Sequence, residues 1–316
     1  PDTYRRFEYA IDRGLNYFDT ASRYARGKSE EGLGMLAKLP GIRDRIFIST
    51  KFSDYYRRLD QLAKEIFDGL PGEKQSALQR KAKELVEERG IDKPGYFFQY
   101  FPSQRRSIEP SYLTHVVKQE YGYQSKWKSI ISKELMETIE TSLKRLNTDY
   151  VDVLHCPHGA RIPEDLEDEI IAETFDKVKS QGKARFFALS SHTDASSVLS
   201  KAADLPHYDV AMVAYNIASH GHLDPAIRKA TSKGMGIIAM KAAAGVFTKY
   251  SQLEIPDWRI QKLDHLIPED IQIQPKAYLW ALQNPNLSAV ISEMFDQKMM
   301  DENFAIVGRK LEMPLA

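Results

Sequence analysis

The sequence GLNYFDTASRY, residues 14–24, contains a short apolar run that stops at Asp19. The residues before it carry apolar side chains at helical spacing, and Gly14 is typical of the end of a helix. A second apolar run, in RIFISTK at residues 45–51, stops at Lys51 in the same way. These stretches predict units of a helix followed by a strand, each strand ending at a polar side chain.

The same unit recurs along the chain. Amphipathic helix patterns separate short apolar runs, which is the pattern of a parallel sheet with helices on its faces. The predicted strands are residues 15–18, 45–50, 150–154, 184–189, 209–214, 236–240 and 287–291. Asp194 is expected to cap the helix that follows residues 184–189.

These strands favour a closed barrel over a doubly wound sheet, because no G-x-G-x-x-G loop is present to cradle phosphates. We therefore predict an α/β protein whose residues 1–316 form a single (β/α)₈ TIM barrel. An eighth strand, the first of the barrel, is expected to precede Pro1. Without it, the barrel would be open between the neighbours of that strand.

The composition indicates a globular protein that acts on a small molecule. Hydrophobic residues make up 42% and charged residues 28% of the 316 residues, and no apolar run has the roughly 18 residues of a membrane span. The 44 basic residues balance the 44 acidic ones, which argues against nucleic acid as a partner. Cys156 is the only cysteine, so neither an internal disulfide nor a cysteine-based metal site is expected.

Two properties are left open by the sequence. The chain begins at Pro1 without an initiator Met, so we expect the natural N-terminus to lie further upstream. A cytoplasmic location is therefore assigned only by default, and the oligomeric state is not predicted.

Residues 53–128 interrupt the alternation of strands and helices. About 75 residues are far more than a usual loop between a strand and its helix, so we predict an inserted subdomain. It has helical patterns of its own at residues 59–66 and 78–85, and an aromatic run at residues 96–101. Because barrel chemistry lies at the carboxyl ends of the strands, we expect this segment to cover the active-site face. A surface embellishment or an oligomer contact is the alternative.

Asp19, Tyr24 and Lys51 are the candidate catalytic residues. Adjacent strands of a parallel barrel end side by side, so these side chains are expected to converge. Reduction of a carbonyl needs an acid for the developing alkoxide, and a tyrosine, with an ordinary pKa of about 10, needs a nearby cation that favours its phenolate. Lys51 would be that cation, and Asp19 would hold it in place. No side chain donates a hydride, so this chemistry also requires a cofactor.

At these residues the chain resembles the aldo-keto reductase family. GLNYFDTASRY is similar to the family signature around the catalytic aspartate and tyrosine, and IFISTK is similar to the strand that carries the lysine. The resemblance continues through SLKRLNTDYVDVL, GKARFFALSSH, YDVAMVAYN, GMGIIAMK and NPNLSAVI. It identifies a divergent member with a large insertion after the lysine strand. It implies an oxidoreductase that transfers a hydride between NADP or NAD and a carbonyl or alcohol substrate, with Tyr24 as general acid.

The histidine of the family's catalytic set has two candidates in LHCPHG, residues 154–159. His158 lies nearer the distance expected from the preceding strand. Strand alternation counted from Asp152 instead favours His155, unless Pro157 introduces a bulge that changes the alternation. We choose His158.

The resemblance also implies a nicotinamide nucleotide site. The matching positions are Ser190 and Ser191 for the nicotinamide amide, Met240 for contact with its ring, Lys241 toward the phosphates, Ser292, and Asn303 for the adenine. No metal site is predicted.

Three positions of this site depart from the family pattern. Met212 stands where a glutamine usually holds the carboxamide, and Met299 replaces a customary arginine or glutamine. Glu293 replaces the basic residue that neutralises the 2′-phosphate of the adenosine. Because a carboxylate repels a phosphate, a preference for NADPH is not predicted.

Two other functions remain open. One is a regulatory or sensor protein that binds a nicotinamide nucleotide with little turnover, which the changes at Met212 and Glu293 permit. The other is a barrel lyase or isomerase in which Tyr24 and Lys51 move protons without hydride transfer. Fold alone does not separate these functions. His192 and the other histidines of the later loops are interpreted as surface residues.

Overall fold

The computed structural model describes residues 2–91, 93, 96, 98–100, 103–123, 125–244, 246–247 and 255–311. Seven strands in this part form one parallel sheet in sequence order. They are β1 (Tyr17–Asp19), β2 (Phe47–Lys51), β3 (Val151–His155), β4 (Ala184–Ser191), β5 (Val210–Ala214), β6 (Gly236–Met240) and β7 (Ala289–Val290). Each lies on a predicted apolar run, with ends that differ by at most two residues. The prediction of these strands is confirmed.

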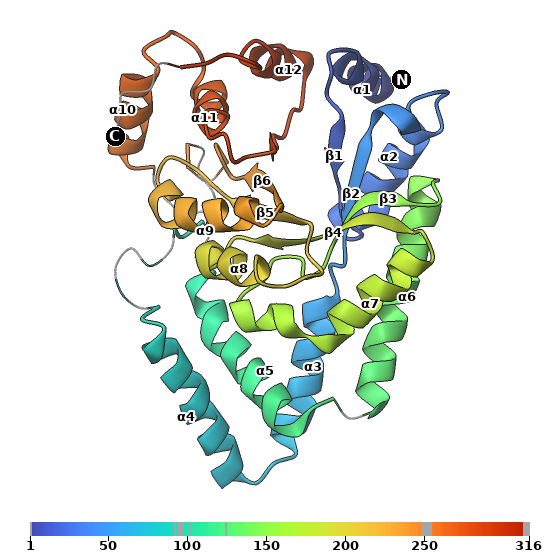
Figure 1. The fold of residues 1–316 in the computed structure, drawn as a ribbon, viewed down its shortest axis with the longest axis vertical. Helices are drawn as coiled ribbons and strands as arrows, with labels where there is room; N and C mark the ends of the chain where they lie inside the picture. Colours follow the sequence, from blue (N-terminus) through green and yellow to red (C-terminus); the bar gives the residue numbers. More distant parts are fainter. Residues whose placement is uncertain are drawn as a thin grey trace.

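Helices surround the curled sheet (Figure 1). Those of the barrel are α1 (Asp2–Asp12), α2 (Lys28–Ala37), α6 (Ser125–Leu146), α7 (Glu169–Ser180), α8 (Ala195–Ala202), α9 (His220–Ser232), α10 (Asp257–Leu266), α11 (Ile273–Ala281) and α12 (Gln297–Phe304). Short 3₁₀ turns cover Tyr24–Gly27 (η1), Arg43–Arg45 (η2), Arg105–Ser107 (η3) and Pro163–Glu167 (η4). Within the described residues, no helix combines the length and apolar character needed to cross a membrane.

One hydrophobic core lies between the sheet and these helices. It contains buried side chains from successive strands, such as Ile48, Leu154, Leu189 and Ile238. Helices α7, α8 and α9 contact β4, β5 and β6 respectively. Because the strands are apolar on both faces, the polar residues at their carboxyl ends mark where the core stops.

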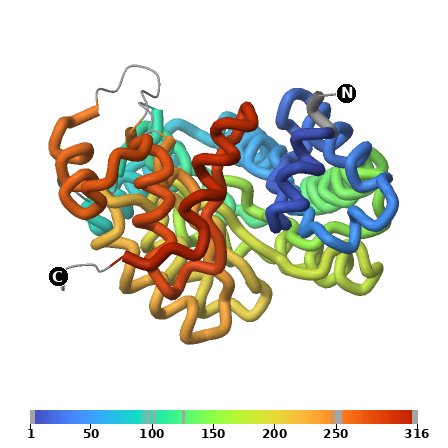
Figure 2. Tube along the Cα trace, turned by 90° about the horizontal axis from the view of Figure 1, so that it is seen from above, coloured from blue at the N-terminus to red at the C-terminus, as the bar shows by residue number. Residues whose placement is uncertain are grey.

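The two edges of the sheet are β1 and β7 in the part of the chain that the structure describes. Helices α1 and α12 lie next to each other near these edges (Figures 1 and 2). Arg6 Nη1 donates to the carbonyl oxygen of Phe295 at 2.5 Å, and the hydroxyl of Tyr9 donates to Asp301. The first and last described helices are therefore joined directly by polar contacts.

Segment 53–128 forms α3 (Tyr55–Asp68), α4 (Gly72–Glu88) and α5 (Ile108–Tyr121), which extend away from one end of the sheet (Figure 1). These helices share a second hydrophobic cluster that includes Leu62, Leu78 and Val116. The predicted end of the segment at Lys128 falls inside α6, which already begins at Ser125. Of the aromatic run, Phe97 and Phe101 lie outside the described residues.

Candidate functional site

Asp19 and Lys51 meet at the carboxyl ends of β1 and β2. Asp19 pairs in register with Ser49, which brings the Lys51 ammonium to 2.5 Å from Asp19 Oδ2. The same ammonium donates to the carbonyl oxygen of Thr20 at 2.7 Å. Lys51 is only 2% exposed, and burial lowers the pKa of its ammonium, while the Asp19 carboxylate opposes that shift. The pair is thus a buried cation held by one carboxylate.

Tyr24 packs against this ion pair from the loop after β1. Lys51 Nζ lies 4.9 Å from the centroid of the Tyr24 ring, and the His158 ring contacts it edge-on with centroids 6.0 Å apart. Tyr24 is 41% exposed, so solvent and small molecules reach its side chain. The structure therefore brings Asp19, Tyr24, Lys51 and His158 together.

His155 is buried beneath this group. Its Nε2 lies 3.0 Å from Ser49 Oγ, and Ser49 donates to Asp19 Oδ1 at 3.0 Å. Because the serine has one hydroxyl proton, and gives it to the carboxylate, His155 must donate from Nε2. Burial, with the charge of Lys51 as the second cause, lowers the pKa of His155 to about 3. His155 is a neutral support for Asp19 with no exposed surface.

His158 lies in a bulge where β3 leaves the sheet. The Ser190 N–H donates to the carbonyl of Pro157 at 3.1 Å, and the Ala160 N–H donates to the carbonyl of Ser190 at 2.6 Å. Ser190 of β4 thus bonds to Pro157 before His158 and to Ala160 after Gly159. His158 and Gly159 are left without a partner in this pairing and form the bulge.

The His158 ring is neutral at physiological pH. Its Nδ1 lies 2.9 Å from Ser53 Oγ. Burial lowers the pKa of His158 to about 3, and the charge of Lys51 acts in the same direction. Unlike His155, it is partly exposed beside Tyr24.

Ser190 and Ser191 are buried at the end of β4. Ser190 Oγ accepts from the Gly159 N–H at 2.9 Å. Ser191 Oγ lies 2.8 Å from the carbonyl oxygen of Ala160 and 2.7 Å from that of Thr193. Both hydroxyls therefore help to fix the bulge that carries His158.

Of the remaining predicted cofactor residues, Met240 and Lys241 lie at the end of β6, Ser292 follows β7 and Asn303 lies on α12. Met240 is 7% exposed, and Lys241 follows it with a φ of 60°. Burial lowers the pKa of Lys241, and the exposed carboxylate of Glu293 opposes that shift. Asn303 Nδ2 donates to Ser292 Oγ at 3.2 Å.

Met212 and Met299, the other two residues that depart from the family pattern, differ in their surroundings. Met212 is 1% exposed and packs in the core within β5, so its position offers an apolar surface where the family usually has an amide. Met299, in contrast, is 40% exposed on α12.

His192, predicted as a surface residue, is half-buried at the end of β4. It directly follows β4, and its ring contacts that of Tyr100 edge-on with centroids 6.3 Å apart. Burial lowers the pKa of His192 to about 4, and the charges of Lys241 and Lys51 add to the shift. His192 therefore lies within electrostatic reach of both lysines. Its position directly after the two serines was the available signal in the sequence.

Segment 53–128 reaches the carboxyl ends of β4 and β5. Asn216 Nδ2 donates to the hydroxyl of Tyr100 at 2.6 Å, and Gln104 Nε2 donates to the carbonyl of His192 at 3.0 Å. Gln104 Oε1 in turn accepts from the Tyr100 N–H at 2.8 Å. Tyr100, Gln104 and Asn216 are at most 2% exposed. Sequence reasoning missed these three residues because each depends on a partner far away in the chain.

Buried carboxylates anchor the same segment to the loop before α7. The hydroxyl of Tyr55 donates to Asp168 at 2.5 Å, and that of Tyr56 donates to Asp165 at 2.7 Å. Lys118 adds an ion pair to Asp168 at 2.9 Å. Burial raises the pKa of Asp165. The segment is thus held by specific polar bonds as well as by apolar packing.

Arg89 holds the segment at a second point. It donates to Asp194, and also to the hydroxyl of Tyr96 at 2.8 Å. Asp194 is the N-cap residue of α8, as predicted, with a φ of 49°, but its side chain accepts no bond from a backbone N–H of the first turn. Its carboxylate instead pairs with Arg89.

Known proteins are similar to this chain in sequence and in fold. The model of the Aldo/keto reductase family matches residues 1–110 and 113–313. An L-galactose dehydrogenase of Arabidopsis thaliana is 26% identical over 61% of this chain, and the match spans 64% of the length of that relative. A probable voltage-gated potassium channel subunit beta of the same plant is 26% identical over 94% of this chain and 79% of its own.

Solved structures of aldo-keto reductases share the fold. The holo form of one from Bacillus halodurans is 19% identical, with a TM-score of 0.62 over 99% of this chain and 83% of its own. One from Klebsiella pneumoniae in complex with NADPH is 17% identical, with a TM-score of 0.56 over 98% of this chain and 80% of its own. With its curled parallel sheet and the match along nearly all its length, the chain belongs to the aldo/keto reductase family.

Proposed function

We propose that this protein is an NAD(P)-dependent oxidoreductase that transfers a hydride between a nicotinamide cofactor and a carbonyl or alcohol substrate. The observation that carries the proposal is the buried Lys51 ammonium, paired with Asp19 and packed against the accessible Tyr24 ring. A proton donor beside a buried cation suits reduction, because an alkoxide develops in the transition state.

Each member of the group has a distinct role in this proposal. Tyr24 gives its proton to the substrate oxygen, and Lys51 stabilises the phenolate that remains. Asp19 keeps Lys51 in place. His158 is neutral, and when its Nδ1 accepts from Ser53, its Nε2 is left to donate to the substrate oxygen. The fully buried His155 has no such access.

The chemistry of this donor set fits a nicotinamide cofactor, because the group supplies a proton but no hydride. A bound nicotinamide would supply that hydride. The residues proposed to hold it are Ser190, Ser191, Met240, Lys241, Ser292 and Asn303. The buried side chain of Met212 offers the carboxamide no hydrogen bond, so we expect weaker positioning there. Glu293 leaves the choice between NADH and NADPH open, although the Klebsiella pneumoniae relative binds NADPH.

We further propose that segment 53–128 is an inserted subdomain of a single barrel and covers the active site. Its support is the contact of Gln104 with His192 and of Tyr100 with Asn216. His192 directly follows β4 and Asn216 lies two residues after β5, and the carboxyl ends of both strands face the site. The segment would then shape the space for the substrate.

A second function is favoured by one relative. The match to a probable potassium channel subunit beta covers 94% of this chain, which supports a regulatory role as the second proposal. The buried Met212 agrees with this alternative.

One experiment separates the two functions. The protein is titrated with NADPH and NADH while cofactor fluorescence is followed, and a panel of aldehydes and ketones is then added. Oxidation of the cofactor that depends on the carbonyl, and that falls about 10²- to 10⁴-fold in Tyr24→Phe, would support the reductase. Tyr150→Phe, at the opposite end of β3, is the matched control. Binding without turnover would favour the regulatory role, and no binding would refute both.

A further inference from the structure

The geometry points to Glu30 and Arg145 as positioning residues for the Tyr24 loop and for Lys51. The inference rests on the proposed function, because it assigns these residues a role in the alignment of the same catalytic group. They would act through hydrogen bonds that join the Tyr24 loop and strand β2 to helices α2 and α6.

Glu30 is a fully buried carboxylate on α2. Its Oε1 accepts from the Thr50 hydroxyl at 2.7 Å, and its Oε2 accepts from Arg145 Nη1 at 3.2 Å. Thr50 directly precedes Lys51 in β2. A buried carboxylate is costly unless it is paired and hydrogen-bonded, so Glu30 firmly fixes both partners.

Arg145 extends this network to the loop that carries Tyr24. From the last turn of α6, its Nη1 also donates to the carbonyl oxygen of Ser22 at 3.3 Å. Ser22 Oγ donates in turn to the carbonyl oxygen of Lys51 at 3.1 Å. The bonds therefore form a closed circuit from Glu30 through Lys51 and Ser22 to Arg145. A shift of one member moves the Tyr24 loop relative to Lys51.

The turn after Tyr24 lies directly on the Arg145 guanidinium. Ala25 and Arg26 have φ values of 47° and 58°, which are unfavourable for residues with a side chain. At Gly27, with a φ of 90°, an added Cβ would lie 2.7 Å from the guanidinium carbon of Arg145. Such a turn persists only if its surroundings hold it.

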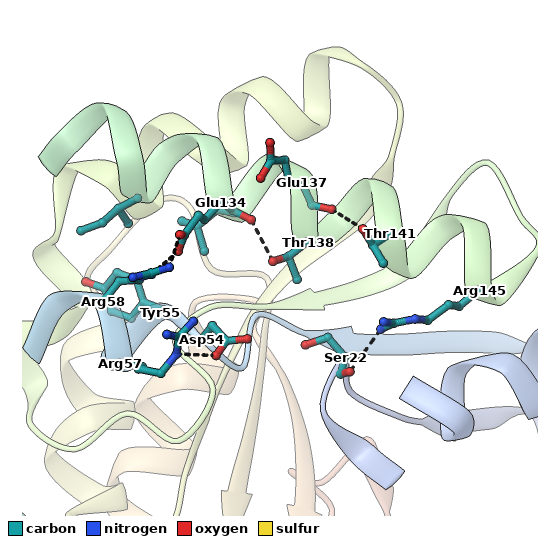
Figure 3. Close-up of a pocket in the computed structure, with 12 residues that line it drawn as sticks. Ser22, Asp54, Tyr55, Arg57, Arg58, Glu134, Glu137, Thr138, Thr141 and Arg145 are labelled. Atoms are coloured by element: carbon teal, nitrogen blue, oxygen red, sulfur yellow. Dashed lines mark hydrogen bonds and ion pairs between the residues drawn. The ribbon is translucent and has the colours of Figure 1, made fainter. Parts of the chain in front are cut away.

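The contact between Arg145 and Ser22 borders a pocket. A cavity of about 280 Å³ lies between α3 and α6, and Ser22 and Arg145 both line it. Figure 3 shows the Arg145–Ser22 bond at one end of this cavity. On the side of the pocket no side chain packs against this contact, so hydrogen bonds contribute to the restraint there.

The test compares Glu30→Gln with Asp152→Asn, each in the full-length protein. Asp152 is also a buried carboxylate bound to arginines, Arg43 at 2.9 Å and Arg185 at 2.8 Å, but it lies on β3 away from the site. We measure kcat, KM and the cofactor Kd for both variants, each with Tyr24 and with Tyr24→Phe. Amide hydrogen exchange of residues 22–27 gives a readout that is independent of activity.

We expect Glu30→Gln to lower kcat by roughly 10- to 100-fold with little change in cofactor Kd, as for a small displacement of a catalytic group. In the Tyr24→Phe background it should cause no further loss, because the group that it positions has no proton to give. Exchange in residues 22–27 should become faster in Glu30→Gln but not in Asp152→Asn.

Equal losses of kcat in both backgrounds, or an equal loss in Asp152→Asn, would overturn the positioning role. If Tyr24→Phe alone left kcat unchanged, the proposed function would fail instead, so the two failures are distinguishable. If Glu30→Gln did not fold, Ser22→Ala would test the same circuit at a surface-accessible loop. It should show the same dependence on Tyr24, and additive losses would again contradict the inference.

Discussion

Replacement of Asp19 by asparagine should destabilise the fold by an amount that depends strongly on pH. The variant leaves the Lys51 ammonium, 2% exposed, without its carboxylate. Two unit charges 2.5 Å apart attract by about 7 kcal/mol at an effective dielectric constant near 20, and desolvation offsets much of this. Removal of one partner of a buried pair costs roughly 3 to 5 kcal/mol. We expect about 3 kcal/mol at neutral pH, since the Asp19 carboxylate retains 14% exposure.

The sign of the pH dependence follows from Lys51. Burial lowers the pKa of its ammonium below the ordinary value of 10.5, so the unfolded chain binds more protons in the range just below that value, and stability rises with pH there. In Asp19→Asn the main opposition to burial is lost and only the weaker attraction of Glu30 remains, so the pKa of Lys51 falls further and the rise in stability begins at lower pH. The deficit, which is the free energy of unfolding of the wild type minus that of Asp19→Asn, should therefore shrink as the pH increases toward 10.5.

Urea denaturation at several pH values measures this deficit. Asp19→Leu combined with Lys51→Met is the control, because it removes both charges and should be less damaging than Asp19→Asn alone at neutral pH. A deficit that stayed constant or grew with pH would refute the reasoning, as would a double variant whose losses simply add.

Three further predictions concern the site and its cover. Because the pKa of His158 is about 3, protonation of this histidine should not lower kcat between about pH 8 and pH 5. A fall of kcat at acidic pH that disappears in His158→Gln would contradict this. Arg89→Met should cost about 3 kcal/mol in urea denaturation and speed proteolysis within segment 53–128, because Asp194 keeps a buried carboxylate; unchanged cleavage would count against the anchoring role. Glu293→Lys should favour NADPH over NADH by about tenfold in fluorescence titrations, and an unchanged ratio of Kd values would exclude a role for this charge.

The strands and the Asp19–Lys51 pair could be predicted because both depend on local pattern. An apolar run that stops at a polar residue defines a strand end, and parallel topology then places neighbouring strand ends side by side. No partner from elsewhere in the chain is needed to make that argument. The same reasoning correctly brought Tyr24 to Lys51 from a loop only five residues after Asp19.

Other features depend on contacts that local pattern does not contain. The bulge at His158 is created by backbone bonds to Ser190 on another strand, so alternation counted along β3 could not establish it. The carboxylate of Asp194 pairs with Arg89 instead of a backbone N–H of α8, and the ring of His192 packs against Tyr100. The partners in both cases come from segment 53–128, whose docking is set by tertiary packing rather than by sequence period.

The carboxylates beneath segment 53–128 have a consequence for which substitutions the protein tolerates. Asp165 and Asp168 are 3% and 2% exposed, and their side-chain donors Tyr55, Tyr56, Lys118 and Tyr123 all belong to the segment. Replacement of one donor alone would leave a buried carboxylate with one partner fewer. Replacement of either aspartate by an apolar residue would in turn leave buried donors unsatisfied in the intact protein. A change on one side of this contact is therefore best tolerated when the other side changes with it.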